Sequence, residues 1–475
     1  MPYSPAAARI GRCRRRALRC SAMDTDDLQR RCLTGSGSIS SELVDRLLER
    51  GHGAVVADRA GRGEWFCASA WARSLAGEGR LDEALEVLAP YVATTWWTAV
   101  VEVAELLEDG GRTEEAIETV RARTALGHPQ ALEHYARLLA RHGRATEAFD
   151  LLLPLADERG RISALAEVAA AAGREEEAAA LLSARIAEHR CTDFPWCCRG
   201  FDIDTARGLL ATIRERQGRI DDAIALLRPR HAVQGGSRDQ LADLLARHGR
   251  FQELYAYAKA TGDEEALEPL AQVLEERGDV EGAIAVYRWE ELPAAEHPNA
   301  AFAHAQLLAR HGRDDEAIAV MRDQADRRPA EDWILHTLTD LCLKAGRPAE
   351  GLAHLDILAT RRGGQEPWDL YWFRLSLLAA RDGVDTAVQQ ARTHPEADTP
   401  YAAADIARLL ADSGRTEEAV AALEQHTVPR WHTTKLAGYL IDLGRTTEAL
   451  ALLQRTTAPP PPTPTADLWA DMPPF

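Results

Sequence analysis

A seven-residue phrase recurs along the chain and restricts the folds open to it. Leu-Leu-Ala-Arg-His-Gly-Arg stands at 138–144, 244–250 and 307–313. Apolar residues at helical spacing precede each copy, and a second helical pattern follows it. A turn that recurs between two helical segments is typical of a helical-repeat array. We therefore interpret the 475 residues as one series of stacked units rather than as several unlike domains.

Each unit can be indexed on the glycine of its central turn. Successive glycines are 29 to 37 residues apart, except for one gap of 45. This period predicts stacked helical hairpins, because one pair of helices cannot bury its apolar face alone. The twelve indexing glycines are Gly79, Gly111, Gly143, Gly173, Gly218, Gly249, Gly278, Gly312, Gly346, Gly383, Gly414 and Gly444.

Small residues occupy two fixed positions around this turn. Alanine recurs five residues after the glycine in nine units, and a small residue stands seven residues before it in all twelve. Small side chains let two helix backbones approach closely, and a leucine there would destabilise by about 1–3 kcal/mol through overpacking. The glycine suits the left-handed residue that closes a helix. The earlier position holds Ala72, Ala104, Ala136, Ala166, Ala211, Ala242, Ala271, Ala305, Thr339, Ser376, Ala407 and Ala437.

Charged residues mark the two helix ends at the turn. Basic residues end the first helix and acidic residues begin the second, which complements both helix dipoles. An arginine follows the glycine in ten units, and we expect its charge to meet neighbouring acids rather than an acidic partner. His142, His248 and His311 precede the glycine in separate units, so we interpret them as helix-end groups. The predicted N-caps of the second helices are Thr113, Asp314, Thr416 and Thr446.

These features form one pattern. It consists of the small residue, the glycine turn, the acidic pair with alanine after the turn, and an apolar residue four places later. Leu88 and Leu423 are examples of that last position. This pattern resembles the tetratricopeptide repeat (TPR) family over residues 65–456. The resemblance implies an all-α, right-handed solenoid of about twelve TPR-like helix-turn-helix repeats. It also implies that partner peptides lie along the concave face made by the first helix of each unit.

Composition shifts divide the chain into four predicted parts. The first is basic and then rich in glycine and serine, and Met23 is an alternative start. The last contains Pro459–Pro462 and is expected to be extended. The predicted parts are a disordered basic arm and linker at 1–38, capping helices at 39–63, the TPR-like solenoid at 64–456 with an insertion at 185–204, and a proline-rich disordered tail at 457–475.

Net charge and hydropathy limit the kinds of partner and the cellular location that we expect. The net charge is −18, and −24 without the first 22 residues, which carry six arginines and no acid. Nucleic acids and anionic membranes need a basic surface, so neither is expected as a partner, although a nucleic-acid reader using residues 1–22 stays an alternative. No stretch reaches the ~18 apolar residues of a membrane span, and no secretory signal is recognisable. We therefore expect a cytoplasmic protein with reduced cysteines.

Motifs that specify an enzyme are missing. The sequence contains no GxxxxGK[ST], GxSxG or HExxH. Adjacent glutamates on a helix point about 100° apart, so the acidic pairs cannot flank one bond. The leading prediction is a non-enzymatic scaffold that uses no cofactor and binds a protein or peptide partner. The oligomeric state stays open.

One cluster of soft ligands supports an alternative function. His189, Cys191, Cys197 and Cys198 could supply an imidazole and three thiolates to a tetrahedral zinc ion. The C-x5-C-C spacing is not typical of zinc sites, and the competing interpretation is an insertion loop whose cysteines pack as small apolar residues. The alternative is thus a metal-binding or redox-responsive regulator.

Residues that differ between units are the candidates for partner binding. The positions thirteen and ten residues before the glycine are expected to face the concave groove, and in the last four units they are mostly aromatic or apolar. Aromatic rings bring a large contact area at low entropic cost, although they can equally pack between helices. The predicted partner-binding residues are Trp333, His336, Leu370, Phe373, Tyr401, Arg408 and Trp431.

The C-terminal tail is a candidate regulator of the scaffold. Leu468, Trp469 and Phe475 follow the proline stretch. The tail could return these apolar side chains to the groove or to the last helix, and thereby compete with a partner.

Overall fold

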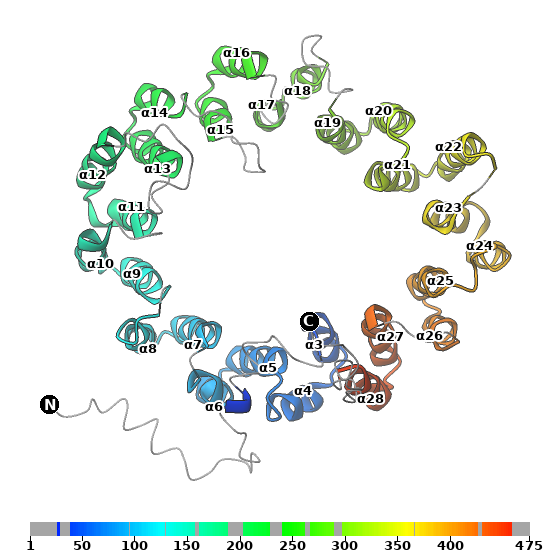
Figure 1. The fold of residues 1–475 in the computed structure, drawn as a ribbon, viewed down its shortest axis with the longest axis horizontal. Helices are drawn as coiled ribbons and strands as arrows, with labels where there is room; N and C mark the ends of the chain where they lie inside the picture. Colours follow the sequence, from blue (N-terminus) through cyan, green and yellow to red (C-terminus); the bar gives the residue numbers. More distant parts are fainter. Residues whose placement is uncertain are drawn as a thin grey trace, which may run out of the picture. The chain divides into compact units, whose positions relative to one another are not determined.

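The computed structural model is a series of α-helices without strands in the residues that it describes (Figure 1). Those residues are 26–28, 39–94, 96–128, 130–156, 161–188, 203–228, 240–261, 267–288, 297–364, 366–425 and 430–457. The chain forms two compact lobes. Lobe 1 comprises residues 1–131 and 398–475, and lobe 2 comprises residues 132–397.

Twelve helical hairpins follow one another along the chain, each with a first helix A and a second helix B. The A helices are α5 (Trp65–Gly77), α7 (Trp97–Asp109), α9 (Ala131–Arg141), α11 (Arg161–Ala172), α13 (Ile203–Arg216), α15 (Gln240–Arg247), α17 (Leu267–Glu276), α19 (Pro298–Arg310), α21 (Asp332–Lys344), α23 (Trp368–Asp382), α25 (Pro400–Asp412) and α27 (Arg430–Asp442).

The B helices occupy the even-numbered places and complete the hairpins. They are α6 (Leu81–Val92), α8 (Thr113–Thr124), α10 (Ala145–Leu152, extended by η2, Leu153–Leu155), α12 (Glu175–Glu188), α14 (Ile220–Leu227), α16 (Phe251–Thr261), α18 (Val280–Val286), α20 (Asp314–Arg327), α22 (Pro348–Arg361), α24 (Val384–Ala391), α26 (Thr416–Glu424) and α28 (Thr446–Thr457). The all-α repeat architecture predicted from the sequence is confirmed.

Neighbouring hairpins stack through their A helices. Helix B of one hairpin packs against helix A of the next, as α20 does against α21 and α22 against α23. In several hairpins helix A also contacts the next helix A, as α19 contacts α21, whereas no two neighbouring B helices in the described residues pack comparably. Within lobe 2, the odd-numbered helices accordingly follow the inner edge of the curve and the even-numbered helices the outer edge (Figure 1). The A helices therefore carry the surface on which residues from several hairpins come together.

The turn between helices A and B is a Schellman motif in eleven of the twelve hairpins, as Gly79 illustrates. Gly79 has a φ of 79°. Its N–H donates to the carbonyl of Ala76 at 2.9 Å, and the N–H of Arg80 donates to the carbonyl of Leu75 at 2.9 Å. Only glycine adopts this left-handed conformation without a steric penalty, which explains why it recurs in every turn.

The predicted N-caps of the B helices were wrong by one residue. Thr113, Asp314, Thr416 and Thr446 are the first residues of their helices. In three of these helices the N-cap is the preceding arginine, which makes no side-chain cap hydrogen bond. An arginine has no acceptor with which to cap an N–H group. Its side chain instead binds the acid three residues later, as Arg112 does with Glu115 at 2.6 and 2.7 Å.

These arginines meet carboxylates, as the sequence predicted. All ten bind the acid at the third position after them. Several also reach the first turn of the preceding B helix, such as Arg112 to Asp82 at 2.6 Å and Arg313 to Glu281 at 2.9 Å. Because the carboxylates Asp82 and Glu281 are largely exposed, each such link contributes only ~0.2–1 kcal/mol. The guanidinium groups of this row are therefore paired with carboxylates of the same chain.

Lobe 1 brings the first and last helices of the chain together. The N-terminal hairpin consists of α3 (Ser41–Glu49) and α4 (Gly53–Ala60), and α3 packs against α27. Asp442 at the end of α27 lies 3.0 Å from Nη2 of Arg50 and 3.4 Å from Nη1 of Arg46. A side chain on Gly438 would collide with the Arg46 guanidinium. The N-terminal hairpin thus covers the last repeat, much as a thirteenth repeat would.

The helix ends define the borders of the predicted insertion. Helix α12 continues to Glu188 and α13 starts at Ile203. The rest of the insertion, 189–202, lies outside the described residues, as do 1–25 and 458–475. Among the described helices, none has the length and apolar character of a membrane span.

Candidate functional site

Aromatic side chains that are exposed or half-buried form a row along three consecutive A helices of lobe 2. Phe302 on α19 and Trp333 on α21 are each 38% exposed, and their rings meet edge to face with centroids 6.2 Å apart. His336, one turn after Trp333, is exposed and lies 5.8 Å from the ring of the half-buried Trp372 on α23. We call Phe302, Trp333, His336 and Trp372 the aromatic row. It links three hairpins on the inner edge of lobe 2.

The predicted groove residues Leu370 and Phe373 are not part of this row. Both side chains are only 1% exposed and belong to the core. The cause is a shorter turn, because α24 starts directly after Gly383, one residue earlier than in the other hairpins. Gly383 has a φ of 91°, and its N–H donates to the carbonyl four residues earlier, of Ala379, rather than three residues earlier as in the Schellman turns. Every A-helix position in this hairpin is consequently shifted by one residue, and Trp372 takes the place expected for Phe373.

The same shift moves the small-residue position. Ser376 is only half-buried, whereas the preceding Leu375 is 1% exposed. Ala387 of α24, with 0% exposure, occupies the place that alanine takes five residues after the glycine elsewhere. Aligning hairpin 10 on Ala387 rather than on Gly383 would have identified Trp372 from the sequence. Phe302 was also missed, although it stands ten residues before Gly312 at a position expected to face the groove, because the corresponding positions of the earlier units are mostly small or charged.

The other predicted residues lie in lobe 1. Tyr401 on α25 is 62% exposed. Arg408, also on α25, lies 3.6 Å from Asp405 of the same helix. Trp431 belongs to α27, but its side chain lies outside the described residues. Among the predicted residues, the structure therefore brings only Trp333 and His336 into the aromatic row.

Acidic side chains without ion-pair partners lie at the start of two helices that carry the aromatic row. Asp332 precedes Trp333 and is four residues before His336, while Asp369 is three residues before Trp372. Residues at these spacings share one helix face. Asp332, Asp369 and the neighbouring Glu331 are exposed and form no ion pair within the described part of the chain.

The basic residues of the same helices all form ion pairs. The guanidinium groups of α19 and α23 and the ammonium group of α21 each lie within 3 Å of a carboxylate. The pairs are Arg310–Glu275, Lys344–Asp340, Arg374–Glu366 and Arg381–Asp382. The carboxylates of Glu331, Asp332 and Asp369 are consequently the charges beside the aromatic row that no ion pair of the described chain compensates.

The helix-end histidines take part in contacts between hairpins. Nε2 of His248 lies 2.8 Å from Oε1 of Glu215, and Nε2 of His311 lies 2.8 Å from Oε1 of Glu275. Although burial would raise the pKa of Glu215, its hydrogen bonds from Arg247 and His248 lower the pKa below its usual value. These histidines serve the stacking of the array, and they do not converge on one site.

The described cysteines and one buried histidine lack the environment of reactive groups. Burial raises the pKa of Cys67 to about 12 and that of Cys342 to about 11, so both thiols stay protonated at neutral pH. Burial also lowers the pKa of His304 to about 4, and its ring stacks on Tyr287 with centroids 5.3 Å apart. The described residues contain no group of three or more His, Cys, Asp or Glu placed to hold a metal ion. His189, Cys191, Cys197 and Cys198 lie outside them.

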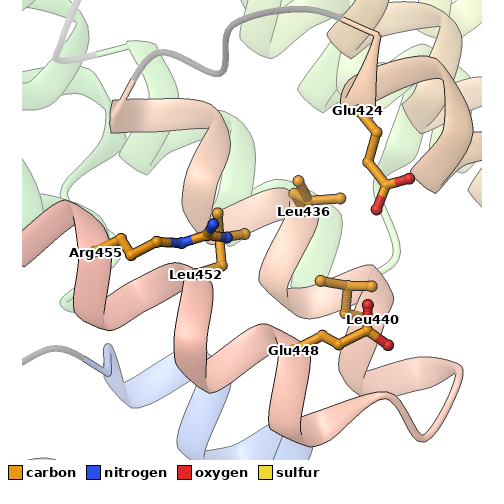
Figure 2. Close-up of a pocket in the computed structure, with 6 residues that line it drawn as sticks. All are labelled: Glu424, Leu436, Leu440, Glu448, Leu452 and Arg455. Atoms are coloured by element: carbon orange, nitrogen blue, oxygen red, sulfur yellow. The ribbon is translucent and has the colours of Figure 1, made fainter.

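A shallow pocket of about 210 Å³ lies between the last helices of lobe 1 (Figure 2). Figure 2 shows Leu436 and Leu440 of α27 facing Leu452 and Arg455 of α28, with Glu424 and Glu448 at the rim. Arg455 stands two residues before Thr457, where the described chain ends. The pocket therefore adjoins the start of the C-terminal tail.

Comparison with known proteins agrees with a TPR-like repeat. The tetratricopeptide repeat family matches residues 400–425, which span hairpin 11. A solved Naa15/Naa10 complex bound to HypK-THB is similar at 16% identity and a TM-score of 0.46, over 91% of this chain and 68% of that chain. A tetratricopeptide repeat protein from Parabacteroides merdae ATCC 43184 is similar at 15% identity and a TM-score of 0.26, over 66% of this chain and 99% of that chain. No curated protein matches the sequence. The chain is a TPR-like helical-repeat protein.

Proposed function

We propose that this TPR-like protein is a non-enzymatic, cytoplasmic scaffold that binds a segment of another protein along the aromatic row. The observation that carries the proposal is the continuity of Phe302, Trp333, His336 and Trp372 across three A helices. Large rings that stay exposed on a folded surface are typical of binding sites, since aromatic anchors dominate the energy of many interfaces.

The geometry supports a linear segment as the bound partner. The two ring contacts, at 6.2 and 5.8 Å, place aromatic groups from successive hairpins beside one another. An extended chain advances ~6–7 Å for every second residue, so alternate side chains can meet successive rings. The proposal therefore concerns a peptide-like segment and not a small molecule.

Affinity capture with the full chain tests this proposal. The variant Phe302→Ala/Trp333→Ala/Trp372→Ala removes the row, and Ile357→Ala/Leu126→Ala is the matched control because these side chains are 47% and 71% exposed elsewhere. Partners identified by mass spectrometry should be lost from the row variant and kept by the control. Circular dichroism checks that both variants retain their helix content. Capture of the same partners by a folded row variant would contradict the proposal.

A second proposal concerns regulation by the chain's own tail. The pocket of Figure 2 has a leucine floor, and Arg455 lies at its edge. Residues 458–475 follow directly and contain Leu468 and Trp469 together with acidic but no basic residues. Glu424 and Glu448 at the rim both pair with Arg445, so Arg455 is the cation of this pocket that can meet the acidic residues of the tail. The unpaired acids beside the aromatic row would repel the same residues.

Truncation after Thr457 tests tail docking. A synthetic peptide of residues 458–475 should bind the truncated chain, and Arg455→Glu should weaken that binding. Arg62→Glu is the control, because Arg62 is an exposed residue in the turn that follows α4. A peptide that binds the truncated chain and its Arg455→Glu variant equally would rule out this pocket.

A further inference from the structure

We infer that the partner segment of the aromatic row is cationic, with arginine side chains next to its apolar anchors. This inference rests on the proposed function and specifies the chemistry of the partner. It arises from the pairing of an acid and a ring on two successive A helices, Asp332 with His336 on α21 and Asp369 with Trp372 on α23.

Each acid lies where it can bind a cation that is already in contact with a ring. Asp369 and Trp372 are three residues apart, and Asp332 and His336 four, so each pair shares one face of its helix. A guanidinium group stacks on an indole face and also donates paired hydrogen bonds to a carboxylate, whereas an ammonium group acts as a point charge. Arginine therefore fits both parts of the Asp369–Trp372 pair.

The charge balance around the row favours the same partner. Every lysine and arginine of α19, α21 and α23 has a carboxylate partner, while Glu331, Asp332 and Asp369 have no ion-pair partner in the described part of the chain. Asp332 and Asp369 also stabilise the N-terminal ends of their helices, but this role leaves their carboxylates accessible. An acidic segment would meet uncompensated negative charge, and a neutral segment would leave it unpaired.

The test uses fluorescently labelled peptides that share leucine and tryptophan anchors and differ only in the residues between them. These residues are arginine, glutamine or glutamate, and fluorescence anisotropy measures binding to the full chain. A guanidinium group stacked on Trp372 and paired with Asp369 should give the arginine peptide about tenfold higher affinity than the glutamine peptide. The glutamate peptide should bind most weakly.

The variant Asp332→Asn/Asp369→Asn isolates the charge contribution. It should reduce the preference for arginine to less than about threefold while leaving the glutamine peptide unaffected. Glu49→Gln/Glu86→Gln makes the same charge change at acids of α3 and α6 and should keep the preference. Their comparison excludes a general attraction of cations to a chain of charge −18.

The outcomes separate this inference from the proposed function. If Trp333→Ala/Trp372→Ala abolishes binding of all peptides but the asparagine variant keeps the arginine preference, the row binds partners and the cationic specificity is wrong. If the arginine peptide fails to bind, or binds no more tightly than the glutamate peptide, the inference is overturned. If the tryptophan variant binds every peptide like the unmodified chain, the proposed site itself is refuted.

Discussion

Replacing Asp442 by asparagine should loosen the N-terminal hairpin from the last repeat. The carboxylate of Asp442 is 18% exposed and lies within 3.4 Å of both Arg46 on α3 and Arg50, the residue directly after that helix. Asparagine keeps the shape but removes the charge to which the two guanidinium groups bind. The perturbation therefore tests the contact that joins helices at opposite ends of the sequence.

The magnitude follows from the exposure of the three groups. Arg46 is 32% and Arg50 54% exposed, so solvent screens both interactions, and each contributes ~0.2–1 kcal/mol. The two interactions together contribute about 0.4–2 kcal/mol, which corresponds to a roughly two- to thirtyfold rise in the open population of the hairpin.

Amide hydrogen exchange of α3 is the appropriate assay because opening of one hairpin is a local event. Amides of the buried residues Leu43, Val44 and Leu47 should exchange faster in Asp442→Asn by about that factor. Asp58→Asn is the matched control, because among the described residues Asp58 on α4 pairs only with Arg62 in the turn after that helix, and both groups are exposed. Exchange at α3 that is equal in the two variants would refute the packing of the chain ends described above.

Three further changes test the register and the titratable groups. Phe373→Ala should destabilise by about 3–5 kcal/mol in urea unfolding, whereas Trp372→Ala should cost clearly less, because only Phe373 is fully buried. Burial lowers the pKa of His304 to about 4, so as the pH falls the imidazole is protonated in the unfolded chain before it is protonated in the folded chain. The free energy of unfolding should therefore fall as the pH drops from about 6.5 to 4, and His304→Leu should remove this fall. The hydrogen bond from Arg310 lowers the pKa of Glu275 in the folded chain. The ionised Glu275 side chain therefore stabilises the fold above the usual glutamate pKa of ~4.3, and this stabilisation disappears as the pH falls through the pKa of the folded state. Glu275→Gln should reduce the difference in urea midpoint between pH 7 and pH 3, and an unchanged difference would contradict this role.

The sequence predicted those features that depend on local chemistry. A glycine after a run of helix-forming residues specifies a Schellman turn, and a small residue at a fixed distance specifies where helices cross. Both rules act within a few residues, so they identify the hairpins without knowledge of the fold. They also place Trp333 and His336 correctly on the exposed side of their helix.

The same rules fail where a turn changes length or where distant residues meet. The turn at Gly383 is one residue shorter than the others, and this single difference places Leu370 and Phe373 in the core. The contact between Arg50 and Asp442 joins residues 392 positions apart, and neither residue stands in an unusual local pattern. Such features follow from the packing of the whole array.

Site-specific photocrosslinking tests the role of the aromatic row most directly. Photoreactive benzoylphenylalanine in place of Trp333 or Trp372, and in place of Ile357 on a B helix as the control, would be activated in the native lysate. The account predicts that positions 333 and 372 capture a common protein partner through a basic segment, and that position 357 does not. Capture of that partner at position 357 alone, or at none of the three positions, would contradict it.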